Sequence, residues 1–405
     1  RLDGVTGVQT CALPISLRMI CSICDAETRI GVKKDPRSVA LRAHKYLLST
    51  GIADSSTWIP ELEFHLFDTV QFNSDPFSAG YNVTSSECKD SLPDENEDLD
   101  GLSLQGVKGY HMDTPFDQYY EIRQRIVDLI EDQEIKVRYH HHEVGVSSQQ
   151  EIETELLEFP RICDDVMIMK DIIRRTALEY GLSATFMPKP VYNHAGNGMH
   201  FHIMLHKNGK NVFYKKGGYA DLSKEAIWFI GGILKHGRAL VAFTNPSTNS
   251  FKRLLPGFEA PVKLFYGLAN RSAAIRIPKY ANTPESKRFE FRTGDGTCNP
   301  YFAMSAILMA GLDGIKNKID PAKYNLGPFD DNVYAWSEEK KAKLLSIPAD
   351  LAEAMQALKD DHDFLLAGNV FNEELIESHI AMKLKEHEAL AARPHPHEMM
   401  LYYNL

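Results

Sequence analysis

The stretch PELEFHL at residues 60–66 decides how this chain is read, because polar and apolar residues alternate through it without interruption. Alternation with a period of two is the pattern of a β-strand, whose successive side chains point to opposite faces. Glu61, Glu63 and His65 should therefore share one face. The opposite face should pack in a core, and it carries Leu62, Phe64 and Leu66.

Two further segments alternate in the same way. In MHFHIML at residues 199–205, His200 and His202 fall on one face and the other face is wholly apolar. In RFEFR at residues 288–292, the apolar face is aromatic and the polar face consists of Arg288, Glu290 and Arg292. Each of these strands can bury one face and present carboxylate, imidazole or guanidinium groups on the other.

A run of histidines supplies further candidate ligands. The segment HHHEV at residues 140–144 contains Glu143 and leads into a loop that ends at Glu151. For any one of these segments, an amphipathic surface strand is the simpler explanation. Solvated strand faces favour Thr, Lys, Ser and Gln, however, so segments rich in Glu, His and Arg together favour a sheet curved around a polar cavity.

Glutamates gathered in such a cavity would repel one another, and their pKa values would rise unless cations compensated the charge. Oxygen-rich sites with a single histidine suit Mg²⁺ or Mn²⁺ better than structural zinc, which prefers Cys and His. The sequence therefore predicts divalent cations among the carboxylates of Glu61, Glu63, Glu143, Glu151 and Glu290.

Arginine is the second clue to the chemistry. The planar guanidinium fork matches carboxylates and phosphates. Metal-binding carboxylates beside several arginines indicate phosphoryl transfer, and no G-x-x-x-x-G-K-[ST] run points to a Walker-type ATPase. Five arginines fall within forty residues of one another: Arg253, Arg271, Arg276, Arg288 and Arg292.

Composition excludes some classes of function. Lys and Arg number 45 against 55 Asp and Glu, a formal net charge of −10, which argues against a general nucleic-acid binder. No apolar run reaches the roughly 18 residues of a membrane span. Six cysteines in 405 residues make no disulfide framework, so a reducing, cytoplasmic setting is expected. We interpret the lone C-x-x-C of Cys21 and Cys24 as core thiols.

Helix caps mark several helices between the strands. Asp35-Pro36 should open a helix that ends at Thr50, and Thr114-Pro115 and Asn299-Pro300 should open two more. Strands and helices intermix without a regular βαβ rhythm, which favours an α+β fold. Further helices are expected at about 161–180, 224–244 and 373–390.

Taken together, these motifs resemble type I glutamine synthetase from about Leu17 to the C-terminus. Besides the strands above, the resemblance rests on GNGMHFH at 196–202, NPSTNSFKRLLPGFEAPV at 245–262, NRSAAIRIP at 270–278 and CNPY at 298–301. It implies an α+β catalytic domain over 17–405, with an antiparallel curved sheet (a half-barrel) surrounded by helices and a mainly helical part at 335–405. Residues 1–16 look like a non-native, adaptor-like segment, and the family's N-terminal β-grasp domain is expected to be largely missing.

The resemblance implies two metal ions, Mg²⁺ or Mn²⁺, in each site. Their positions match two sets of residues: Glu63, Glu143 and Glu151 for one ion, and Glu61, His200 and Glu290 for the other. Arg253, Arg292 and Gly196 match residues that hold the substrate glutamate. His202, Arg271, Arg276 and Arg288 match residues at the nucleotide, and Glu259 matches a flap residue that closes over the intermediate. Among these, the resemblance gives catalytic roles to Glu259, Arg271 and Arg292.

The implied activity is ATP-dependent ligation of ammonium to the γ-carboxylate of glutamate, by a cytoplasmic homo-oligomer that is a dodecamer of two hexameric rings in the parent. A γ-glutamyl ligase that uses another amine, a non-catalytic relative and a binuclear metal hydrolase are the alternatives. Because the missing domain supplies an aspartate at the ammonium site, we expect the chain as given to have weak or no activity. Tyr334 resembles a tyrosine that some members carry in adenylylated form, although an ordinary surface tyrosine is the commoner interpretation.

Overall fold

A computed structural model of the chain describes residues 19–88, 91, 109–145, 148–257 and 260–405. The adaptor-like segment 1–16 and the flap residue Glu259 lie outside the described residues.

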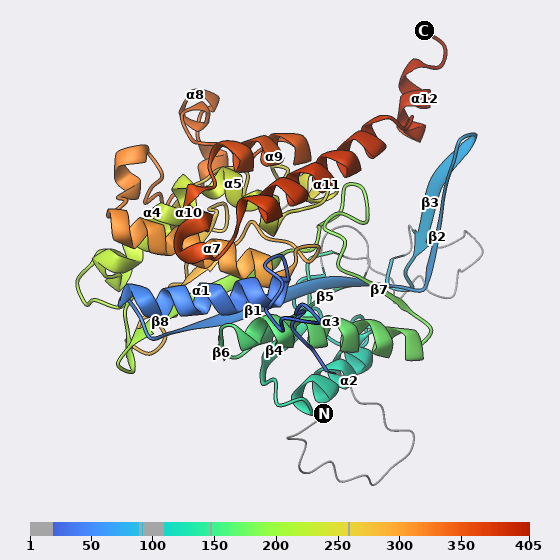
Figure 1. Cartoon of the computed structure of the whole chain (residues 1–405). Coiled ribbons are helices and arrows are strands. Elements are labelled where there is room, and N and C mark those ends of the chain that lie inside the picture. The colour runs from blue at the N-terminus through green and yellow to red at the C-terminus, as the bar shows by residue number, and fades with distance from the viewer. Residues whose placement is uncertain (1–18, 89–90, 92–108, 146–147, 258–259) are drawn as a thin grey trace.

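A large curved sheet organises the structure (Figure 1). Its strands run in the order β10-β11-β12-β8-β1-β5-β4, with β6, β7 and β9 paired at the sides, and the first and last strands do not meet. Every pair is antiparallel except β10–β11, which is parallel. The strands are β1 (Ser55–Phe67), β4 (Val137–His142), β5 (Gln149–Thr154), β6 (Leu157–Glu158), β7 (Ser183–Thr185), β8 (Met199–Lys207), β9 (Lys210–Asn211), β10 (Tyr266–Leu268), β11 (Ile275–Ile277) and β12 (Phe289–Phe291).

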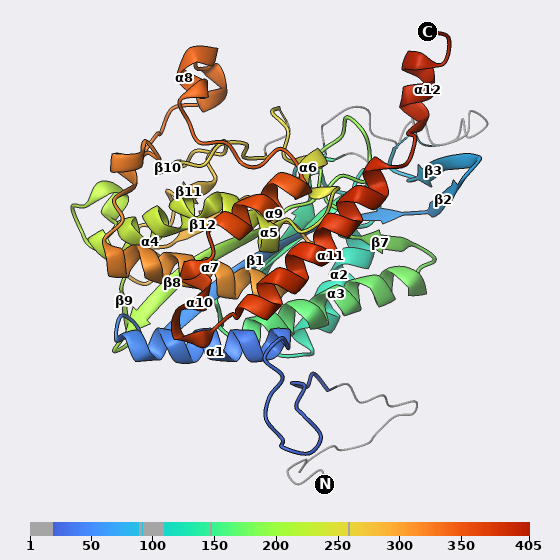
Figure 2. The same ribbon diagram turned by 45° about the horizontal axis from the view of Figure 1, so that its top comes forward.

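Helices pack around this sheet in two groups (Figures 1 and 2). Helices α2 (Tyr120–Glu131) and α3 (Arg161–Glu179) contact each other and the strands β4 and β1. The larger group surrounds α7, and its members are α1 (Pro36–Thr50), α4 (Lys224–Lys235), α5 (Gly237–Thr244), α7 (Pro300–Asn317), α9 (Leu351–Asp360), α10 (Asp363–Leu366) and α11 (Glu373–Ala391). Together with the mixed, largely antiparallel sheet, they confirm the α+β class.

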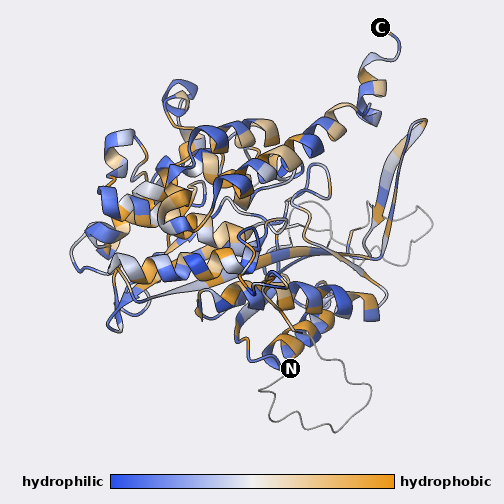
Figure 3. Ribbon diagram, viewed as in Figure 1, coloured by the Kyte–Doolittle hydropathy of each residue, from blue (hydrophilic) through white to orange (hydrophobic). Residues whose placement is uncertain are grey.

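The apolar faces of the three predicted strands form the core. Leu62, Phe64, Phe201 and Phe289 have no exposed surface, and they join a single large cluster with the helices. In Figure 3 orange and blue bands alternate along the helices, as expected for helices with one apolar and one polar face. The polar side of β1 is also buried, which means that it lines an interior site and not the solvent-facing surface.

The predicted caps fix two helices, α1 and α7. Asp35 accepts a hydrogen bond from the Ser38 amide at 2.9 Å, and α1 ends at Gly51 in the left-handed conformation that glycine adopts readily. Asn299 caps α7 in the same manner. Helix α3 ends one residue before the predicted limit, at Glu179.

Two helix predictions were wrong in their bounds. Helix α2 begins at Tyr120, without a side-chain cap, because Thr114-Pro115 lies in a preceding turn. The single helix expected at 224–244 is broken at His236, where α4 and α5 meet at 75°.

Among the described residues, no single helix is long and apolar enough to cross a membrane. The bent pair of α4 and α5 alone meets the length and composition limits, and most of its residues are buried.

The thiols of Cys21 and Cys24 are exposed, so the prediction that they are core residues was wrong. Residues 19–34 form a largely exposed segment with one bridge, between Cys24 and Gly31.

Two elements reach away from the main body (Figures 1 and 2). One is the exposed hairpin of β2 (Thr69–Asp75) and β3 (Ser78–Thr84). The other is the C-terminal end, where α12 (Pro396–Tyr402) follows α11. One short helix, α8 (Glu338–Ala342), precedes α9 in the same C-terminal part.

Candidate active site

The register of the sheet aligns predicted polar residues across neighbouring strands. On one side of β1, Glu63 lies opposite Glu151 of β5, and Glu151 lies opposite His141 of β4. Side chains that face each other across an antiparallel pair have Cβ atoms about 5 Å apart. These three residues therefore form one polar row across three strands.

A second row crosses the other side of β1. Glu61 lies opposite His200 of β8. Two residues further along β8, His202 lies opposite Glu290 of β12, and Glu290 lies opposite Arg276 of β11. Because Glu61 and Glu63 are two residues apart, the two rows share one face of the sheet.

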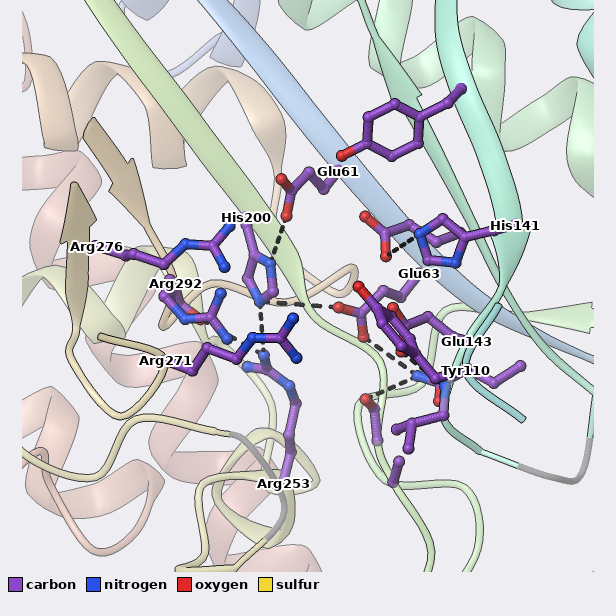
Figure 4. A pocket seen from close by; sticks show the side chains of 16 residues that line it. Glu61, Glu63, Tyr110, His141, Glu143, His200, Arg253, Arg271, Arg276 and Arg292 are labelled. Carbon is purple, nitrogen blue, oxygen red and sulfur yellow. Dashed lines mark hydrogen bonds and ion pairs between the residues drawn. The ribbon is translucent and has the colours of Figure 1, made fainter. Parts of the chain in front are cut away.

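The shared face lines a small pocket that is partly open to solvent. Figure 4 shows the carboxylates of Glu63 and Glu143 on one side and the arginines on the other, with His200 between them. Negative and positive groups thus face each other across the space that a ligand would fill. The lining residues are Glu61, Glu63, Tyr110, Tyr139, His141, Glu143, Val144, Gln149, Glu151, Ala195, Gly196, His200, Arg253, Arg271, Arg276 and Arg292.

Glu61 is the carboxylate best supplied with partners. Its oxygens lie 2.8 Å from Nδ1 of His200 and 2.6 Å from Nε2 of His202. Burial raises the pKa of Glu61, but the two histidines outweigh burial and hold that pKa well below its usual value. Glu61 is therefore a carboxylate fixed in place by imidazoles.

Glu151 has the opposite environment. Burial and the nearby charges of Glu61 and Glu143 raise its pKa well above the ordinary value. Burial also raises the pKa of Glu63, although the Gly198 amide donates to its Oε2 at 2.7 Å. This side of the pocket has more negative charge than the protein neutralises, which is the condition that a bound cation relieves.

The donor atoms suit divalent cations. One group of ligand atoms within 4.8 Å of one another comes from Glu61, His202 and Glu290, and another from His141, Glu143 and Glu151. Carboxylate oxygens with one imidazole in each group fit Mg²⁺ or Mn²⁺. Each group contains two glutamates of the corresponding predicted set.

Glu290 lies behind the pocket wall with no exposed surface. Arg292 donates to its Oε1 at 2.6 Å, and Arg276 donates to its Oε2. Burial raises the pKa of Glu290, but the two guanidinium groups overcome that effect and lower it. The pair of arginines keeps this carboxylate ionised and holds it toward His200, whose Nδ1 is 3.7 Å away.

Arg253, the last residue of the short helix α6 (Ser250–Arg253), packs closely against the glycines of the 196–198 loop. Arg253 donates to the carbonyl oxygens of Thr293 at 3.0 Å and Gly294 at 3.2 Å. A Cβ on Gly198 would lie 2.5 Å from Nη2 of Arg253, and one on Gly196 would lie 2.1 Å from a backbone oxygen. The two glycines are needed for this close approach.

Comparison with known proteins identifies the fold and the site. A family profile described as glutamine synthetase, catalytic domain, matches residues 33–402. The chain belongs to the glutamine synthetase family. It is 41% identical to a glutamine synthetase from Frankia alni over 393 residues, which are 96% of this chain and 82% of that protein. A glutamine synthetase from Aquifex aeolicus is 42% identical over 97% of this chain and 82% of its own length.

Structural similarity agrees with sequence similarity. A Plasmodium falciparum glutamine synthetase solved by cryo-electron microscopy superimposes with a TM-score of 0.84, at 33% identity, over 94% of this chain and 81% of that chain. The likeness therefore covers the curved sheet and both helix groups, and the α+β expectation of a glutamine synthetase catalytic domain is confirmed.

Not all predicted glutamine synthetase site residues reach the pocket surface. His202 and Arg288 are buried beside the lining residues, and Nε of Arg288 donates to Nδ1 of His202 at 3.3 Å. Arg271 does line the pocket, with its guanidinium carbon 5.5 Å from the centre of the Tyr110 ring. Glu151 belongs to β5 and does not end a loop, because that strand begins at Gln149.

Sequence reasoning missed several lining residues. Tyr139 and His141 share a face of β4, and Gln149 shares a face with Glu151 in β5. The histidine run included His141, but the alternation rule used for residues 60–66 does not find Tyr139 or Gln149, because polar residues occupy both faces of 137–142 and 149–154. Tyr110 lies outside helices and strands, and no periodic pattern marks it.

Proposed function

We propose that this chain catalyses the ATP-dependent ligation of ammonia to the γ-carboxylate of L-glutamate through a γ-glutamyl phosphate, giving glutamine, ADP and phosphate. The pocket carries this proposal, because buried carboxylates with raised pKa values face arginines across one space. Membership of the glutamine synthetase family supports the same reaction.

Two divalent cations, Mg²⁺ or Mn²⁺, complete the proposal. Bound cations would neutralise the charge that accumulates on phosphoryl oxygens during transfer. In the proposed assignment, Glu63, Glu143 and Glu151 hold one ion, and Glu61, His200 and Glu290 hold the other. His141 and His202 lie within ligand distance of these groups and are further candidates.

The arginines take the substrates in this proposal. Arg253 and Arg292 hold the carboxylates of glutamate, with Gly196 beside its amino-acid end. Arg271 and Arg276 face the phosphates of ATP, and His202 and Arg288 support the nucleotide side from behind the lining. The carboxylate of glutamate is a poor electrophile, so its oxygen must become a phosphate leaving group before ammonia attacks. Glu259 is proposed to help exclude water, which would hydrolyse the acyl phosphate.

A direct assay tests the reaction. The protein is incubated with glutamate, ATP and Mg²⁺ plus ammonium or hydroxylamine, and glutamine or the hydroxamate is measured. From this chain we expect both products only at a low rate, in line with the weak activity anticipated from its sequence, and a Glu290→Ala variant should lose them because Arg276 and Arg292 then face no carboxylate. Normal turnover by that variant would refute the metal assignment.

A γ-glutamyl ligase for a larger amine is the second candidate. Supplying methylamine and ethanolamine in place of ammonium separates the two: preferential amide formation with either amine would favour the alternative. A relative that has lost catalysis should lack ligands, whereas all six proposed ones are present in this sequence.

Assembly and location complete the proposal. We propose that residues 17–405 form one catalytic domain, and that the parent protein works as a cytoplasmic homo-oligomer, a dodecamer of two hexameric rings. Light scattering on the purified protein measures the mass directly. Tyr334 is half-buried and its hydroxyl donates to the Ala260 carbonyl at 2.7 Å, so adenylylation there would first have to break this bond.

A further inference from the structure

The carboxamide of Gln149 joins three separate parts of the pocket. Its Nε2 lies 3.2 Å from Oε2 of Glu63, 3.0 Å from the carbonyl oxygen of Gly196 and 3.2 Å from Oδ1 of Asn197. Its Oε1 accepts from the Gly145 amide at 2.9 Å. An amide NH₂ has only two hydrogens, so three acceptors share them and the orientation of the group is determined.

The backbone of Gln149 adds a fourth connection. Its carbonyl accepts from the Glu143 amide at 2.8 Å, and its own amide donates to the Gly145 carbonyl at 3.1 Å. A Cβ on Gly145 would lie 2.6 Å from Oε1 of Gln149, so the turn fits closely around this side chain. One buried residue therefore contacts both Glu63 of β1 and Glu143, which directly follows β4.

Gly196 connects these hydrogen bonds to the proposed substrate site. In the proposed function, Gly196 lies beside the amino-acid end of glutamate while Glu63 and Glu143 hold a metal ion. Gln149 is the residue whose side chain hydrogen-bonds to both sides, through Glu63 and through the Gly196 carbonyl. Its neighbour Asn197 extends the connection, because Oδ1 of Asn197 also lies 2.9 Å from Nδ1 of His65.

We infer that Gln149 is a positioning residue that couples the glutamate-binding loop at 196–198 to the metal-binding carboxylates Glu63 and Glu143. The inference rests on the proposed function and adds a residue to it. When Nε2 donates, Glu63 is held toward the pocket and the loop is held against it. Loss of the donor frees both together, so metal affinity and glutamate affinity should fall together.

Gln149→Met tests this coupling, because methionine has nearly the same length and donates no hydrogen bond. We expect the Mn²⁺ dissociation constant, measured by electron paramagnetic resonance without substrates, to rise roughly tenfold or more. The KM for glutamate should rise by a similar factor, whereas the KM for ammonium should change little. Gln149→Glu keeps the acceptor for Gly145 but places a carboxylate against Glu63, and should weaken glutamate binding further.

Gln150→Met is the matched control. Gln150 is the next residue of β5 and is fully buried, but its side chain faces Arg123 on the other side of the sheet. The Gln150→Met variant should keep the wild-type affinities for Mn²⁺ and glutamate even if its unfolding temperature falls. Equal losses in Gln150→Met, or wild-type affinities in Gln149→Met, would overturn the inference and leave the proposed function intact. Failure of the wild-type protein to bind Mn²⁺ would overturn both.

Discussion

Single residues in this pocket show how a binding site can cost stability. Glu153 and Glu151 are both buried glutamates of β5, but Arg138 donates to Glu153 at 2.6 Å, whereas Glu151 has carboxylates as its principal neighbours. Buried charge without a compensating partner destabilises a fold. Glu151 therefore favours cation binding but lowers the stability of the metal-free protein.

Glu151→Gln should accordingly stabilise the metal-free protein at pH 7 by roughly 0.5 to 2 kcal/mol. The pKa of Glu151 is higher in the folded than in the unfolded chain, so its stabilising contribution is complete below the unfolded value near 4.5 and is lost as the pH rises through the folded pKa. Urea unfolding in EDTA measures this change. Glu153→Gln is the control and should stabilise less, because burial also raises the pKa of Glu153 but the substitution removes the ion-pair partner of Arg138.

The Glu151→Gln variant should also be stabilised less by added metal ions. Excess Mn²⁺ should raise the unfolding temperature of the wild type more than that of Glu151→Gln. An equal increase in both proteins would show that Glu151 does not bind the ion.

Gly198→Ala should displace the Arg253 guanidinium, because the added Cβ would lie 2.5 Å from Nη2 of Arg253 and 2.7 Å from Nε2 of His200. We expect the KM for glutamate to rise about tenfold or more, as for loss of a charge-assisted hydrogen bond. Gly31→Ala is the control, since its nearest neighbour is the Ser38 hydroxyl at 3.6 Å. Steady-state kinetics with glutamate as the varied substrate should give a raised KM for Gly198→Ala and an unchanged KM for Gly31→Ala.

At the scale of elements, the break between α4 and α5 depends on a histidine that three helical segments share. Nε2 of His236 lies 3.0 Å from Asp313 of α7, and Nδ1 lies 2.8 Å from Asp361, which follows α9. Its ring also stacks on Phe364, with 4.1 Å between centroids. The bend is thus held by tertiary contacts.

His236→Asn should destabilise the protein by about 1 to 3 kcal/mol at pH 6, because two carboxylates lose a partner. Burial lowers the pKa of His236, but Asp313 and Asp361 outweigh burial and raise it above the ordinary 6.5. The stabilisation is complete below pH 6.5 and should decline as the pH rises through the folded pKa. Urea unfolding at pH 6 and pH 9 measures the difference, and exposed His397→Asn should show none. A loss that is independent of pH would contradict the ionic role.

These elements also show how far sequence alone could reach. Alternation at residues 60–66, 199–205 and 288–292 predicted the strands and their polar faces, and the caps at Asp35 and Asn299 predicted α1 and α7, because both signals are local. The bend at His236 was missed because its partners are more than seventy residues away in the chain. Which carboxylate meets which histidine depends on strand order, and alternation within one strand carries no information about that order. Family resemblance supplied the assignments of Arg271 and Gly196.

For the whole molecule, the net charge of −10 is less informative than its distribution around one pocket. Carboxylates of β1, β5 and β12, together with Glu143 directly after β4, converge there from segments that span more than two hundred residues. Because these segments approach one another only in the folded protein, cations bound among them should stabilise the fold as a unit.

Removing divalent metal should therefore lower the unfolding temperature of the entire chain in one transition. At 100 times the dissociation constant, one bound ion contributes about 2.7 kcal/mol. Calorimetry with Mn²⁺ should give two ions per chain. A stoichiometry of one would contradict the two-ion assignment, and an unchanged transition in EDTA would show that neither group binds metal.

The central place of β1 has a consequence for biosynthesis. Its partner on one side, β8, follows it by more than 130 residues, so β1 cannot acquire both neighbours until the ribosome has released residue 207. Until then β1 exposes unpaired backbone N–H and C=O groups along at least one edge of the strand. Long-range strand pairing of this kind is slow. We expect the growing polypeptide to need chaperone protection over that interval, and the mature protein to exchange the amide hydrogens of β1 more slowly than any others.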